Sequence, residues 1–122
     1  MAWKFIIGKE ISTQIADRIT VDLLTGAVLP EQRLPDIPDM SRITGASANT
    51  VVDAYNELIH EGIVLNKGVL VFNPDLTKAR ERRENIARAA CVRLCGELDS
   101  LGLNAKEQMQ LFGKVLVDAS HK

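Results

Sequence analysis

The chain has 122 residues, of which 46% are hydrophobic and 25% are charged, and its formal net charge is −1. These values are those of an ordinary globular protein with one domain and a short appendage. No apolar run approaches the ~20 residues of a membrane-spanning helix. The short apolar run at the N-terminus, with Lys4 as its only positive charge, is not a secretory signal. We therefore expect a cytoplasmic protein that does not enter the membrane.

The charges are distributed unevenly along the chain. Residues 1–75 carry six basic and ten acidic side chains, whereas residues 76–122 carry nine basic and six acidic side chains. A nucleic-acid-binding surface is usually basic, because phosphate neutralisation and counterion release supply most of the non-specific affinity. The acidic first part therefore argues against strong DNA binding, unless its basic residues gather on one face.

The first predicted element is an amphipathic helix over about residues 9–25. Its apolar face is marked by a residue at every fourth position, namely Ile11, Ile15, Ile19 and Leu23. Such spacing is typical of a helix that buries one side, and Gly26 is the residue expected to end it. The apolar arm before the helix, residues 3–7, is expected to pack on this helix or on a dimer partner.

The segment from Asp36 to Gly62 predicts a helix-turn-helix unit. A short helix begins near Asp36, with Pro38 tolerated in its first turn, and Gly45 marks the turn that follows. Ser47 is a good N-cap for a second helix, whose apolar residues recur at helical spacing, and Gly62 ends that helix. A unit of this kind places its second helix in the major groove of DNA.

The first residues of the second helix would lie nearest the base edges. Asn49 is suited to adenine, with which asparagine pairs bidentately, while Ser47 and Thr50 are suited to phosphates or bases. The alternative is that Ser47 only caps the helix and that Asn49 and Thr50 are solvated, since many helix-turn-helix pairs serve packing alone.

A β-hairpin is predicted directly after Gly62. Its strands are residues 63–65 and 69–72, and its tip is Asn66, Lys67 and Gly68. A helix-turn-helix followed immediately by a hairpin is a winged helix.

Over about residues 9–73 the chain resembles the DNA-binding domain of the GntR family of bacterial transcriptional regulators. The resemblance rests on Gln14 and Ile15, Gly-Ala-Val-Leu-Pro at 26–30, Arg-Leu-Pro at 33–35, Asn-Thr-Val at 49–51, Ala-Tyr at 54–55, Glu-Leu at 57–58 and Glu-Gly-Ile at 61–63. The short remainder is most similar to the YtrA-type subfamily, whose members carry a small two-helix dimerisation segment. That remainder is too short for the larger effector-binding domains of other subfamilies, so no effector is inferred.

The resemblance implies which residues touch double-stranded DNA. They are Ser47, Asn49 and Thr50 in the major groove and Lys67 and Gly68 at the wing. Arg33 is a further candidate for a phosphate contact, although a surface salt bridge is an equal alternative for it.

The chain departs from the family at three positions where members usually place DNA-contacting arginines. These positions correspond to Pro38, Ala48 and Val52, none of which is basic. The usual Gly-x-Gly-Thr at the wing tip is also shortened. The alternative function is therefore a degenerate winged helix that acts as a protein-interaction module with weak or no DNA binding.

Two further helices are predicted after Asp75, which is expected to cap the first of them over residues 76–100. Apolar residues at threes and fours form one seam along it: Leu76, Ala79, Ile86, Ala87, Ala90, Cys91, Leu94, Leu98 and Leu101. Asn104 and Glu107 indicate a capping box at the start of the last helix. The chain offers too little to cover this seam, so we expect a symmetric homodimer, which would match a palindromic operator.

A basic run lies on the long helix: Lys78, Arg80, Arg82, Arg83, Arg88 and Arg93. Because Glu81 and Glu84 are interspersed, the run predicts a solvated helix with ion pairs at spacings of three and four residues. The alternative is a surface that faces phosphates or a partner.

No enzyme, metal site or cofactor is predicted. Cys91 and Cys95 lie one helical turn apart on the apolar seam and are expected to be buried small hydrophobes, with a redox or metal role across a dimer as the alternative. His60 stands in no catalytic constellation, and no phosphate-binding or nucleophile motif is present.

The sequence thus predicts an α+β, mainly α chain in two parts. Residues 1–74 form a winged helix-turn-helix DNA-binding domain, and residues 75–122 form a helical dimerisation hairpin. The predicted function is that of a homodimeric, sequence-specific regulator, and more narrowly a repressor, of a palindromic DNA operator.

Overall fold

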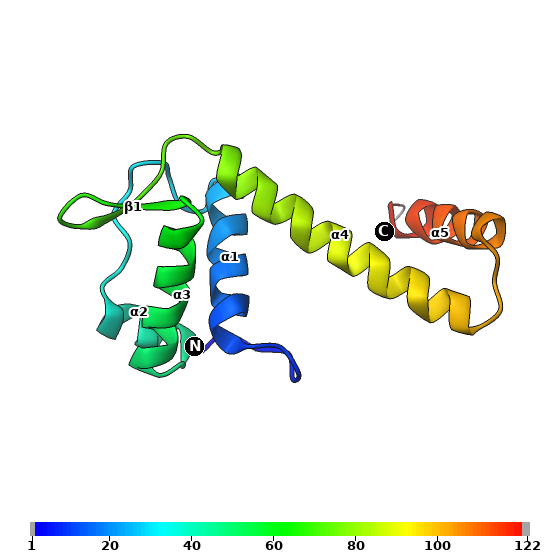
Figure 1. Ribbon diagram of the computed structural model, residues 1–122, viewed down its shortest axis with the longest axis horizontal. Helices are drawn as coiled ribbons and strands as arrows, with labels where there is room; N and C mark the ends of the chain where they lie inside the picture. The colour runs from blue at the N-terminus through cyan, green and yellow to red at the C-terminus, as the bar shows by residue number, and fades with distance from the viewer. Residues whose placement is uncertain (1, 121–122) are drawn as a thin grey trace. The chain divides into compact units, whose positions relative to one another are not determined.

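The computed structural model describes residues 2–120, and the chain divides into two compact units that meet between Asn85 and Ile86. The elements in chain order are α1 (Ile11–Thr25), α2 (Ile37–Thr44), α3 (Ala48–His60), β1 (Val64–Asn66), β2 (Leu70–Phe72), α4 (Thr77–Ser100) and α5 (Ala105–Ser120) (Figure 1). The predicted fold class, a winged helix-turn-helix followed by two helices, is confirmed.

The core of the first unit lies between α1 and α3, which run side by side (Figure 1). The buried apolar residues of the two helices are Ile15, Ala16, Ile19 and Leu23 from α1 and Val51, Ala54, Tyr55 and Leu58 from α3. Val64 and Phe72 from the hairpin close this core. The four-residue spacing seen in the sequence therefore marks the buried face of α1, except that Ile11 is 43% exposed.

The helix-turn-helix is set by its capping residues. The Asp36 carboxylate accepts a hydrogen bond from the Asp39 amide at 3.0 Å and so begins α2. Gly45, at φ +78°, ends α2 in the left-handed region, and a Cβ there would lie 2.6 Å from the Cβ of Ala2. Gly45 is therefore required both by the turn and by the approach of the N-terminal arm.

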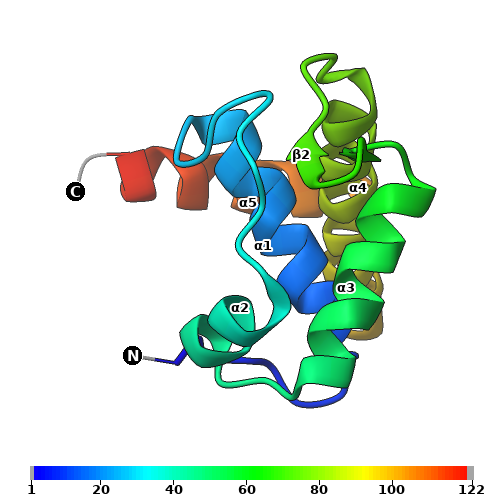
Figure 2. The same ribbon diagram turned by 90° about the vertical axis from the view of Figure 1, so that its left-hand side faces the viewer.

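The N-terminal arm packs on the first unit only in part. The Trp3 amide donates to the carbonyl of Thr44 at 3.1 Å, and the Arg18 guanidinium lies 4.0 Å from the Trp3 ring centroid. In Figure 2 the arm runs past the turn that joins α2 to α3. Ile6 and Ile7 are 73% and 100% exposed, so their side chains do not pack on α1, and the alternative, packing on a dimer partner, stays a prediction.

The hairpin is slightly shifted from its predicted position. Val64 pairs with Phe72, and Asn66 pairs with Leu70, so Asn66 belongs to β1 rather than to the tip. Arg33 forms an isolated antiparallel bridge with Val71. The connection between α1 and α2 therefore runs along the outer edge of β2, which joins the wing to the helices.

The basic run on α4 is not uniformly solvated, because Arg82 is only 7% exposed. Its guanidinium donates to Asp17 on α1 at 2.8 Å and to Glu57 on α3 at 3.3 Å, and it also pairs with Glu61. Burial lowers the pKa of Arg82, but the hydrogen bond to Asp17 and the charges of the carboxylates outweigh it and hold the pKa above its ordinary value. The prediction of a solvated helix is therefore wrong at Arg82.

In the second unit, the two helices are joined as predicted and expose much of their apolar surface. The Asn104 amide donates to Glu107 at 3.1 Å and the Glu107 amide donates to Asn104 at 2.9 Å, which is the reciprocal capping box. No described residue of α5 is buried, and Met109 is 77% exposed. The α4 helix begins at Thr77, one residue later than predicted, with its amide bonded to Asp75 at 3.0 Å.

The Arg82 cluster yields a stability prediction. Replacing Arg82 by Met should lower the free energy of unfolding of the first unit by about 3 kcal/mol, because three carboxylates lose their common cation. The figure is at the lower end of the range for buried pairs, since Glu57 and Glu61 are 32% and 37% exposed. Urea unfolding followed by fluorescence of Trp3, the single tryptophan, measures it.

The matched control is Arg83→Met, because Arg83 is the next residue on α4 and is exposed. This control should change the stability by less than about 0.5 kcal/mol. Equal losses for the two variants would show that Arg82 is not the anchor of the cluster.

Candidate DNA-binding surface

The first turn of α3 is exposed, as a recognition helix requires. Ser47, Ala48 and Asn49 are exposed, and Thr50 is half-buried. The Ser47 hydroxyl accepts from the Thr50 amide at 3.2 Å and lies 2.8 Å from the Thr50 hydroxyl. Capping by Ser47 is therefore present in the structure, and its contact with DNA stays a prediction.

The exposed face of α3 continues beyond the first turn. Asn49, Val52, Asp53 and Asn56 are all exposed, at spacings that place them on one side of a helix. Within residues 2–120 the side chains of Asn49, Asp53 and Asn56 make no hydrogen bond or ion pair. Sequence reasoning missed Asp53 and Asn56, although their spacing of four and seven residues from Asn49 was a usable signal.

The three positions that lack the family's arginines are on the surface. Pro38, Ala48 and Val52 are all exposed, so these residues are free to meet a ligand but bring no positive charge. The nearby cation of α2, Arg42, is paired with Asp39 at 2.8 Å. An exposed pair of this kind is worth little energy and can open when a phosphate competes for the guanidinium.

The wing presents Lys67 and Gly68 at its tip. The Gly68 amide donates to the Asn66 side chain at 3.2 Å, and the Lys67 amide donates to the Val69 carbonyl at 2.9 Å. The Lys67 side chain is exposed. Arg33 is also exposed and is tied through its backbone to β2, so the sheet brings Arg33 and the wing into one structural element.

In the folded chain, several acidic side chains of the first unit are paired with basic ones and do not all contribute to the charge of its surface. Up to Asn85 there are ten basic and twelve acidic side chains. Three of these acids, Asp17, Glu57 and Glu61, surround Arg82, and Lys9 also pairs with Asp17 at 2.8 Å. A share of the acidic excess is therefore used in an internal ion cluster.

Among residues 2–120, no metal-ligand cluster accompanies this surface. In the part of the chain that the structure describes, no three His, Cys, Asp or Glu side chains gather as metal ligands, and no helix is long and apolar enough to cross a membrane. Cys91 and Cys95 are free thiols and are exposed in the single chain, so the expectation that they are buried is not met within one chain.

Comparison with known proteins shows that the first unit is similar to bacterial regulatory proteins. Residues 11–68 match the family described as bacterial regulatory proteins, gntR family. The chain is 28% identical over 109 residues to the HTH-type transcriptional regulator YhcF of Bacillus subtilis (strain 168), covering 88% of this chain and 90% of that protein.

Two solved structures share the fold. One is a GntR family transcriptional regulator from Listeria monocytogenes, with a TM-score of 0.74 and 20% identity, covering 90% of this chain and 98% of that one. The other is YtrA from Sulfolobus acidocaldarius, a GntR-family transcription factor, with a TM-score of 0.53 and 24% identity, covering 97% and 99%.

The two roles considered for Ser47 can be separated by substitution. Ser47→Ala should lower the free energy of unfolding by about 1 kcal/mol, because the cap is lost, whereas Ser47→Asp should keep it, since aspartate caps equally well. If Ser47 also faces a phosphate, the added negative charge of Ser47→Asp should reduce DNA affinity. Wild-type affinity in a stable Ser47→Asp protein would limit Ser47 to capping.

Proposed function

We propose that the chain, whose residues 11–68 match the gntR family of bacterial regulatory proteins, is a YtrA-like transcriptional repressor rather than an enzyme, and that it binds a palindromic operator as a homodimer. The observation that carries the proposal is the capped, exposed first turn of α3. The side-chain amide of Asn49 in this turn makes no hydrogen bond among residues 2–120. Repression would follow from excluding polymerase, and the site of action would be the cytoplasm.

The proposed DNA contacts follow from this geometry. Asn49 reads a base edge, while Ser47 and Thr50, whose hydroxyls lie together at the helix N-terminus, contact a phosphate or base. Lys67 and the Gly68 backbone contact phosphates from the wing, and Arg33 does so from the edge of the same sheet.

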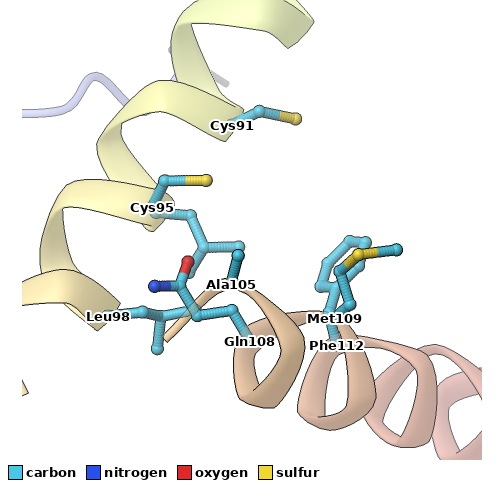
Figure 3. A pocket seen from close by; sticks show the side chains of 8 residues that line it. Cys91, Cys95, Leu98, Ala105, Gln108, Met109 and Phe112 are labelled. Atoms are coloured by element: carbon cyan, nitrogen blue, oxygen red, sulfur yellow. The ribbon is translucent and has the colours of Figure 1, made fainter. Parts of the chain in front are cut away.

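The proposed dimer is carried by the second unit. The residues of α5 that are roughly half-exposed or more include Leu111, Phe112, Val115, Leu116 and Val117. A groove of about 270 Å³ runs between the two helices and is lined by Cys91, Leu94, Cys95, Leu98, Ala105, Gln108, Met109 and Phe112 (Figure 3). Contiguous apolar surface of this extent in a short chain is typical of a protein interface, and a second copy would cover it.

The division of labour proposed from this is DNA binding by residues 1–74 and dimerisation by residues 75–122. The first turns of α4 belong to the second segment but carry Arg82, which packs among Asp17 and Glu57 of the first. Thus the start of α4, up to Asn85, is part of the compact first unit although it lies beyond residue 74.

The competing proposal is a protein-interaction module. It is favoured by one observation, namely that Pro38, Ala48 and Val52 are exposed yet uncharged. The lack of charge at these positions lowers the expected affinity for DNA, but it does not decide between DNA and a protein as the ligand. Asn49 can contact base edges without an arginine beside it.

DNA binding is tested by fluorescence anisotropy on the DNA upstream of the protein's own gene, with a scrambled duplex as control, over a salt series. With Arg33 and Lys67 of each protomer on phosphates, about four phosphates are neutralised per dimer, so the slope of log K against log salt should be about −3.6. Asn49→Ala should reduce the preference for the operator about tenfold.

Binding no tighter than the scrambled control has two explanations that a genome-wide DNA pull-down separates. Recovery of specific sites elsewhere would show that the operator was wrongly chosen. Recovery of no site by a well-folded dimer would contradict the repressor and favour the interaction module.

The dimer is tested by light scattering on a size-exclusion column. The wild-type protein should run at twice the chain mass of 13.4 kDa, and Phe112→Glu should run as a monomer, because a charge cannot be buried at an apolar interface without a partner. The control is Gln110→Glu, an exposed position on the same helix. A monomeric wild type, or a dimeric Phe112→Glu variant, would contradict this interface.

A further inference from the structure

The exposed face of the recognition helix has an unusual chemical character, which bears on the bases that it reads. Beyond Ala48, this face carries Asn49, Val52, Asp53 and Asn56, and all are exposed. None is a cation. The opposite face, with Val51, Ala54, Tyr55 and Leu58, is buried against the core, so this stripe is the side of α3 that remains to meet DNA.

We infer that this face reads A·T base pairs, with Val52 against a thymine methyl group and Asn49 and Asn56 on adenine edges. The inference rests on the proposed function and names the class of operator that it requires.

The argument from Val52 is one of shape and polarity. Its side chain is 38% exposed, and it lies on α3 between the two asparagines. Single exposed apolar residues are common on protein surfaces, so the exposure of Val52 is not by itself evidence of a DNA contact. In the major groove, however, the C5-methyl group of thymine is apolar, and aliphatic side chains make favourable contacts with it.

The argument from the asparagines concerns their free hydrogen-bonding groups. Asparagine matches the N6 donor and N7 acceptor of adenine. Because Asn49 and Asn56 make no side-chain hydrogen bond within residues 2–120, each has a donor and an acceptor available. Adenine and thymine are partners in one pair, so adenine-reading and methyl-reading residues on one stripe favour A·T tracts in either orientation.

The lack of cations argues against the main alternative, which is recognition of guanine. Guanine offers two acceptors, O6 and N7, which arginine and lysine recognise best. The stripe has neither, and the Asp53 carboxylate, itself an acceptor, would be repelled by those atoms. The Asp53 carboxylate accepts instead from the amino group of adenine or of cytosine, so Asp53 disfavours a guanine that faces it but does not by itself separate A·T from C·G pairs.

The test begins with selection of binding sites by the full-length protein from a random duplex library. Each thymine of a selected half-site is then replaced singly by deoxyuridine, which removes only the methyl group and keeps the base pair. At one thymine the wild-type protein should lose about fourfold in affinity, the value of one methyl group removed from water. Val52→Ala should be insensitive to the same replacement.

The matched control is Val21→Ala on α1, because Val21 is 39% exposed and Val52 is 38% exposed. This variant should retain the full deoxyuridine effect. Selected sites rich in G·C at the helix contacts, or equal affinity for thymine and deoxyuridine at every position, would overturn the inference while leaving DNA binding intact. Failure to enrich any site would instead overturn the proposed function on which the inference rests.

Discussion

The guanidinium of Arg82 is the contact on which the arrangement of the first unit depends. It joins Asp17 on α1 to Glu57 on α3 and to Glu61, which directly follows α3, and it does so from the second turn of α4. In the middle of α3, the Tyr55 hydroxyl donates to the Pro35 carbonyl at 2.7 Å. The recognition helix is therefore held by polar contacts in its second half as well as by its apolar face, which lies on α1.

Sequence reasoning found the features that local chemistry determines and missed those that depend on distant partners. Ser47, Gly45 and the pair Asn104 and Glu107 act within a few residues of themselves, so their roles were predictable. Arg82 meets carboxylates 21, 25 and 65 residues away. In a run of alternating charges nothing marks one arginine as buried, because burial is decided by where α1 and α3 pass. The bridge between Arg33 and Val71 was missed for the same reason.

The same cluster changes what the acidic charge of the winged helix means. Net charge predicts long-range attraction to DNA only if the charges face it. Glu57 is on the recognition helix and Glu61 directly follows it, yet both are paired with Arg82. Asp53 is the acid of α3 that stays exposed. The surface that would face DNA is thus less acidic than the number of acidic residues in the sequence indicates, although it remains poor in cations.

A surface poor in cations places a particular demand on the rest of a repressor. With few phosphates neutralised, a single winged helix would bind DNA weakly, and its selectivity would come from base edges. Linking two such domains makes the second contact intramolecular, which multiplies affinity without adding a contact. In the proposed repressor the exposed apolar face of α5 is then as necessary to operator binding as Asn49. Arg82 anchors the first turns of α4 to α3 within the first unit, so the start of the helix that continues into the proposed dimerisation segment belongs to the fold of the DNA-binding domain.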